Sequence, residues 1–144
     1  MNPCSYLTAT TLFLLFPVYF YFQSKSKNTY ETALVSLLVI NIILSFLFWN
    51  DPKPQSVIHT LDGIFAKLSF VLFSIYILFI KDIHGLWWLI SLFLFMLSAT
   101  AFYVSNMHSK IDWCSRDHLL FHAIFHILIS LGCSIAFIPI YSRI

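Results

Sequence analysis

Three histidines and two serines recur at every fourth position near the end of the chain and form its most reactive pattern. They are His118, His122, His126, Ser130 and Ser134. Residues four apart share one face of an α-helix, so these side chains form a slowly drifting stripe. Two imidazoles at positions i and i+4 can hold one metal ion. The pattern therefore predicts a helix on which His122 and His126 are candidate metal ligands.

A structural interpretation of the same residues stays open. Intramembrane histidines often only bond a neighbouring helix, and a single HxxxH pair has little specificity. We interpret Ser45, Ser130 and Ser134 as small packing residues, because membrane helix interfaces favour small side chains. His84 and His108 lie at loop edges and are expected to be solvated.

The composition predicts that these residues lie in a membrane. Of 144 residues, 60% are hydrophobic and 10% are charged. A soluble domain carries about 25% charged residues, and a chain this short cannot bury so much apolar surface in its own core. The formal net charge of +2 is too small to indicate a nucleic-acid partner.

Five apolar segments are long enough, or nearly so, to cross a bilayer as helices, which takes about 20 residues. They cover residues 6–22, 32–49, 61–80, 86–104 and 118–140. Pro17 is a possible kink in the first, and Pro52 and Pro54 help to end the second. Backbone groups in lipid must bond within their own segment. We expect an all-α integral membrane protein, a single domain over residues 1–144 with a bundle of about five transmembrane helices.

The flanking residues leave the orientation open. One side would hold Lys25, Lys27, Lys81 and Arg143, and the other Lys53, Lys67, Lys110 and Arg116. Four against four gives no bias under the positive-inside rule. We interpret Trp87, Trp88 and Trp113 as interfacial anchors. The first twenty residues lack a basic region and a cleavage site, so we expect a retained span.

The three cysteines indicate no cysteine-based metal site. Cys133 lies in an apolar segment and is expected to pack there. Cys4 and Cys114 lie near membrane edges, and their pairing stays open.

Chain direction brings polar residues of three helices to one side of the membrane. The second helix ends there, and the third and fifth begin there. Ser45 and Trp49 lie in the last turns of the second helix, and Asp62 lies at the start of the third. We expect these residues to meet His122 and His126 in a bundle of the second, third and fifth helices. An acid beside two histidines can ligate a metal, orient an imidazole or move a proton.

Three motifs resemble those of a known superfamily. Residues 122–132, His-Ala-Ile-Phe-His-Ile-Leu-Ile-Ser-Leu-Gly, resemble the last-helix motif HAWWHILxGLG of alkaline ceramidases. Ser45-Phe-Leu-Phe-Trp49 resembles the second-helix motif Ser-x-x-[FY]-His, and Leu61-Asp62 resembles the Leu-Asp that opens the third helix. These ceramidases, hemolysin III and adiponectin-receptor-like proteins form the CREST superfamily of seven-helix membrane hydrolases. The resemblance covers about half of the chain.

The resemblance implies a zinc-dependent hydrolase that cleaves a lipid amide. It assigns His122 and His126 as zinc ligands, Asp62 as the acid that handles a proton, and Ser45 as a hydroxyl beside the metal. The family's remaining zinc histidine is Trp49 here, and indole has no lone pair for a metal. The third ligand would come from Asp62 or His59.

His118 has a different expected role from the other two histidines of the stripe. It lies about 12 Å along the helix from His126, too far to share one ion easily. We expect it to anchor the start of the fifth helix at the membrane interface.

The residues leave two principal functions. One is a zinc-dependent hydrolase with a membrane lipid as substrate, which the set Ser45, Asp62, His122 and His126 favours. The other is a non-catalytic relative that binds a lipid or a partner, which Trp49 favours. A transporter or proton relay would need polar residues in the fourth helix, which offers almost none. One helix separates the Asp62 helix from the His122 helix, whereas three helices separate them in the family. Both numbers are odd, so Asp62 and His122 stay on the same side of the membrane.

Overall fold

The computed structural model describes residues 3–139, and its regular elements are helices without β-strands in that range. Five helical segments there are long and apolar enough to cross a membrane. The first comprises η1 (Pro3–Ser5), α1 (Tyr6–Thr11), η2 (Leu12–Leu14) and α2 (Leu15–Gln23). The others are α3 (Thr29–Asn50), α4 (Val57–Ile75) continued by η3 (Tyr76–Ile80), α5 (Gly85–Ile111) and α6 (Arg116–Ser134). The expected all-α bundle of about five helices is confirmed.

Polar caps place the starts of two helices earlier than hydrophobicity alone predicted. The side chain of Asn28 accepts from the Glu31 N–H and starts α3 at Thr29. Ser56 starts α4 at Val57 by the same type of bond. Such side-chain oxygens satisfy N–H groups that the first helical turn leaves unpaired. The expected starts at residues 32 and 61 were therefore three and four residues late.

A buried lysine explains why α6 ends before the expected residue 140, which itself lies outside the described residues. The Nζ of Lys81 donates to three carbonyls just beyond α6, those of Ile135 (2.8 Å), Ala136 (3.0 Å) and Ile138 (2.6 Å). These carbonyls are thereby satisfied without a further helical turn. Burial lowers the pKa of Lys81 to about 8, and the Glu31 carboxylate acts in the opposite direction.

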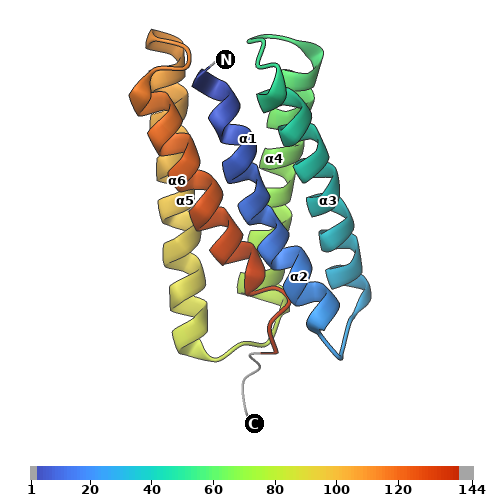
Figure 1. Ribbon diagram of the computed structural model, residues 1–144. Helices are drawn as coiled ribbons and strands as arrows, with labels where there is room; N and C mark the ends of the chain where they lie inside the picture. Colours follow the sequence, from blue (N-terminus) through green and yellow to red (C-terminus); the bar gives the residue numbers. More distant parts are fainter. Residues whose placement is uncertain (1–2, 140–144) are drawn as a thin grey trace.

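The first span lies at the centre of the helix arrangement. In Figure 1, α1 and α2 run between α3 and α6, and both contact each of these neighbours. The helices α3 and α4 pack together, as expected, whereas α6 packs most extensively on α5. The prediction that the last helix packs directly with the second and third was therefore incomplete. Hydroxyls on α1 bond both neighbours, which holds the first span between them.

Pro17 explains how the first span docks on α6. Proline has no N–H, so it cannot donate the helical bond to the carbonyl of Phe13, four residues earlier. The Ser130 hydroxyl of α6 donates to that carbonyl at 2.6 Å. A short 3₁₀ turn, Leu12–Leu14, interrupts the α-helix at the same place. The expected kink is therefore also a bonding site for the last helix.

A disulfide between Cys4 and Cys114 joins the start of the first span to the loop between α5 and α6. This answers the open question of their pairing. The same end of the molecule holds the loop between α3 and α4, while the described chain finishes at the opposite end (Figure 1). Cys133 is free and buried, as a packing residue should be.

Candidate functional site

A cavity of about 110 Å³ lies among α3, α4, α5 and α6 and extends toward the disulfide-bearing end. Its lining includes every candidate site residue from the sequence: Ser45, Trp49, His59, Asp62, His122 and His126. These residues share the lining of one cavity, as expected, while their roles as ligands or catalytic groups stay predictions. A volume of this size holds several water molecules or a small polar group.

The first span supplies the hydrogen-bond partner of His126. The Thr10 hydroxyl oxygen lies 2.8 Å from His126 Nδ1 and 3.0 Å from the Leu7 carbonyl. Its single proton serves one of the two, so the direction of the bond depends on the tautomer of His126. In the tautomer with the proton on Nδ1, the Nε2 atom keeps a lone pair. No described residue bonds to that Nε2.

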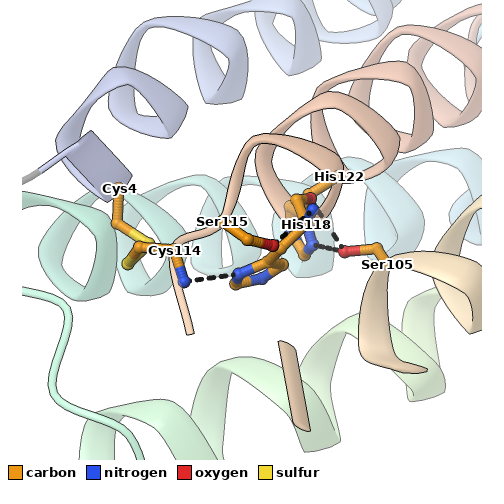
Figure 2. Close-up of a disulfide and its surroundings, with 6 residues drawn as sticks. All are labelled: Cys4, Ser105, Cys114, Ser115, His118 and His122. Carbon is orange, nitrogen blue, oxygen red and sulfur yellow. Dashed lines mark hydrogen bonds between the residues drawn. A yellow bond between two sulfur atoms is a disulfide. The ribbon is translucent and has the colours of Figure 1, made fainter. Parts of the chain in front are cut away.

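A serine of α5 is the corresponding partner of His122. The Ser105 hydroxyl oxygen lies 3.1 Å from His122 Nδ1 and 3.3 Å from the His118 carbonyl (Figure 2). In the tautomer in which His122 donates from Nδ1, its Nε2 atom keeps a lone pair. The two rings are 4.8 Å apart and nearly perpendicular. Metal-binding histidines usually have this arrangement, with one nitrogen hydrogen-bonded and the other free for the ligand.

His118 and His59 have the opposite protonation. Each uses Nδ1 to accept a backbone N–H, from Cys114 at 3.1 Å and from Gln55 at 3.0 Å respectively. Their neutral rings therefore carry the proton on Nε2. His118 is buried, and through the Cys114 N–H it anchors the loop that carries the disulfide to the start of α6 (Figure 2). Ser115, not His118, caps α6.

Two tryptophans form an aromatic wall beside the histidines. Trp49 is 2% exposed, and its ring lies 4.8 Å from that of His122 and 6.2 Å from that of Trp113. The indole Nε1 atoms of Trp49 and Trp113 are buried without a hydrogen-bond partner in the described chain. Trp113 is therefore part of the cavity wall and not a simple interfacial anchor. Buried donors are nearly always paired in proteins, so two orphans in one cavity indicate a missing partner.

The carboxylate of Asp62 and the hydroxyl of Ser45 complete the polar lining. Asp62 is half-buried and makes no hydrogen bond or ion pair with another described residue. The Ser45 hydroxyl lies 3.3 Å from the Thr11 hydroxyl, and either oxygen can be the donor.

The donor set does not form a complete catalytic zinc site. Catalytic zinc normally has three protein ligands, and His122 and His126 supply two. Trp49 stands where the resemblance requires the third. Among residues 3–139, no three His, Cys, Asp or Glu side chains are grouped closely enough to hold a metal ion.

Sequence patterns did not identify the residues that orient the two histidines. Thr10 lies in the first span, which was predicted from its run of apolar residues. Ser105 directly follows the fourth predicted span, residues 86–104, which is the most uniformly apolar of the five. A run of hydroxyls, Thr8, Thr10 and Thr11, was the available signal in the first span. His108, expected to be solvated, is half-buried and stacks on Phe121 with ring centroids 5.8 Å apart.

No protein-family model matches the chain, and the comparisons with curated proteins and with solved structures likewise found no match.

Proposed function

We propose that the protein is a multi-pass membrane protein that binds a lipid with an uncharged hydroxyl- or amide-bearing headgroup in the histidine cavity. Four side chains that line one cavity carry the proposal: Trp49 and Trp113, whose N–H groups have no partner in the described chain, and His122 and His126, whose Nε2 atoms make no bond there. A ligand that accepts from the indoles and bonds the imidazoles in either tautomer needs groups that both donate and accept. Hydroxyl and amide groups do both.

Charge and lining narrow the ligand class further. The cavity lining includes no Lys or Arg to pair with a phosphate, which favours a neutral headgroup. Leu38, Phe70, Phe125 and Ile129 form the apolar part of the wall, which suits the first carbons of an acyl chain. An N-acylated amino alcohol of the ceramide type combines these features.

Binding of a fluorescent ceramide to the purified protein in detergent tests this function. Trp49→Phe keeps the ring but removes the N–H, so the affinity should fall about fivefold, the effect of one hydrogen bond of about 1 kcal/mol. Trp87→Phe is the matched control, because Trp87 is outside the cavity lining, and should bind like the wild type. Equal binding by both variants, or equal binding of fluorescent phosphatidylcholine, would refute the proposal.

A second candidate is zinc-dependent hydrolysis of such a lipid, as the resemblance to the CREST superfamily implies. His122 and His126 support it, since both side chains line one cavity and their Nδ1 atoms are already bonded, which leaves the Nε2 atoms as the candidate metal donors. Bound zinc would polarise the amide carbonyl and water. Asp62 is the better third ligand, because the lone pair of His59 already accepts the Gln55 N–H. Asp62 would then be unable to serve as the proton-handling acid.

Equilibrium zinc titration of the purified protein tests this candidate. Trp49→His supplies the missing imidazole beside His122, so the zinc affinity should rise at least about tenfold. Trp87→His is the control for a new histidine outside the cavity. Negligible zinc binding by Trp49→His would leave lipid binding without metal as the function. Zinc binding by the natural protein that is lost in Asp62→Asn would favour the hydrolase.

A further inference from the structure

Lys67 lies near the middle of a candidate membrane span. The span formed by α4 and η3 runs over Val57–Ile80, which is 24 residues. A helical rise of 1.5 Å per residue places Lys67 about 15 Å from the start of that span. Lysines near helix ends can reach the membrane surface, whereas a lysine at this depth is costly unless it is paired.

No partner for this ammonium occurs within residues 3–139. Lys67 is exposed, and neither a hydrogen bond nor an ion pair connects it to another described residue. Asp62, the other charged residue of the same span, lines the histidine cavity and is not within ion-pair distance. The ammonium group of Lys67 therefore lies on the outer surface of the helix bundle.

A groove of about 200 Å³ between α4 and α5 surrounds this lysine. Its lining consists of Ala66, Lys67, Phe70, Val71, Ala99, Phe102 and Phe125. Lys67 is its charged member, and the two alanines leave room for a helix backbone to approach closely. The helix α5 contacts η3 more than it contacts α4, which leaves this face open.

We propose that this groove docks a transmembrane helix of a partner protein and that an Asp or Glu of that helix pairs with Lys67. A carboxylate on a helix can lie at any depth in the membrane. Lipid phosphates lie about 15 Å from the midplane of a 30 Å core, too far to reach a lysine at the centre. Depth therefore favours a protein partner over an anionic lipid.

A second copy of this chain does not supply the carboxylate. Within the spans, Glu31 is 1% exposed and accepts from the Tyr76 hydroxyl at 2.9 Å. Asp62 belongs to the histidine cavity. Asp117 is the second residue of the span Arg116–Ser134, so it lies at the end of that helix and not at the depth of Lys67. The acidic side chain must therefore come from a different protein.

The groove also adjoins the histidine cavity, because the same four side chains line both: Ala66, Phe70, Phe102 and Phe125. A docked helix would cover the outer wall of that cavity. The docking itself holds whether or not the cavity binds a lipid.

The test uses synthetic Leu/Ala transmembrane peptides with one central Glu or one central Gln, reconstituted with the full chain in phosphatidylcholine vesicles. Energy transfer between labelled protein and peptide measures their association. The Glu peptide should bind about tenfold more tightly than the Gln peptide, as expected for 1–2 kcal/mol of interhelical polar interaction. Lys67→Met should remove this preference without lowering the melting temperature. Lys110→Met, the same change at an exposed position near the end of α5, should retain it.

One further variant and one further lipid condition complete the experiment. Ala99→Trp fills the groove and should weaken binding of both peptides. Equal binding of the Glu and Gln peptides to the natural protein would overturn the proposal, as would a preference that survives in Lys67→Met. Loss of the preference when phosphatidylglycerol is added would show that an anionic lipid occupies Lys67, which also overturns it.

Discussion

Two hydroxyl groups are the hydrogen-bond partners of the two cavity histidines. Thr10 lies against Nδ1 of His126 and Ser105 against Nδ1 of His122. In the tautomer that donates from Nδ1 to these hydroxyls, each ring keeps a lone pair on Nε2 for a metal or a ligand. Helical spacing was enough to predict that His122 and His126 share a face. It could not predict their partners, because the hydroxyls come from other helices, 116 and 17 positions away in sequence.

Hydrogen bonding also predicts that His118 contributes less to zinc affinity than His122 and His126 do. Its Nδ1 accepts the Cys114 N–H and its Nε2 carries the proton, so it offers no lone pair to a metal. His118→Ala should leave zinc affinity within about twofold, while His122→Ala should lower it at least about tenfold. The titration should use the Trp49→His background, where binding is strongest. Equal losses in both variants would show that the assignment of His118 is wrong.

At the scale of elements, the first span was predicted as a helix but not as the central one. Its apolar run and Pro17 indicated a kinked crossing, and the structure has an interrupted helix there. Periodicity carries no information about which helices are neighbours in space. The neighbours follow from hydroxyl and carbonyl groups that pair across helices, such as Ser130 with the Phe13 carbonyl.

That pairing gives a prediction about the stability of the bundle. Ser130→Ala leaves the Phe13 carbonyl without its donor, and Pro17 cannot replace it, so unfolding should become easier by about 1 kcal/mol. Thermal unfolding in detergent measures the change. Ser134→Ala is the matched control, because Ser134 donates within α6 to the Ser130 carbonyl and should cost less. In a Pro17→Ala background the restored N–H should reduce the cost of Ser130→Ala. A cost that is unchanged there would disprove this role for Pro17.

Across the whole molecule, the disulfide distinguishes the two ends of the bundle. Cys4 and Cys114 lie 110 positions apart, and the structure joins them at the end where the histidine cavity extends. Disulfides persist in extracellular or organelle-lumen compartments and are rare in the cytosol. Basic residues alone gave no orientation, partly because Lys67 was counted as a flanking residue although it lies inside α4. Which cysteines pair depends on the fold, so the sequence alone could not provide the Cys4–Cys114 disulfide as a marker of orientation.

The orientation that follows is the last prediction. The N-terminus, residues 51–56 and residues 112–115 should face the extracellular or lumenal side, and residues 24–28 should face the cytosol. None of the five asparagines lies in an Asn-X-Ser/Thr sequence, so glycosylation mapping has no natural background. An acceptor site on a long glycine/serine spacer should be glycosylated in microsomes when inserted within 51–56 but not within 24–28. Maleimide labelling after denaturation should find only Cys133 before reduction and all three cysteines after it. Glycosylation within 24–28 would place the histidine cavity on the cytosolic side, where the Cys4–Cys114 bond would not persist.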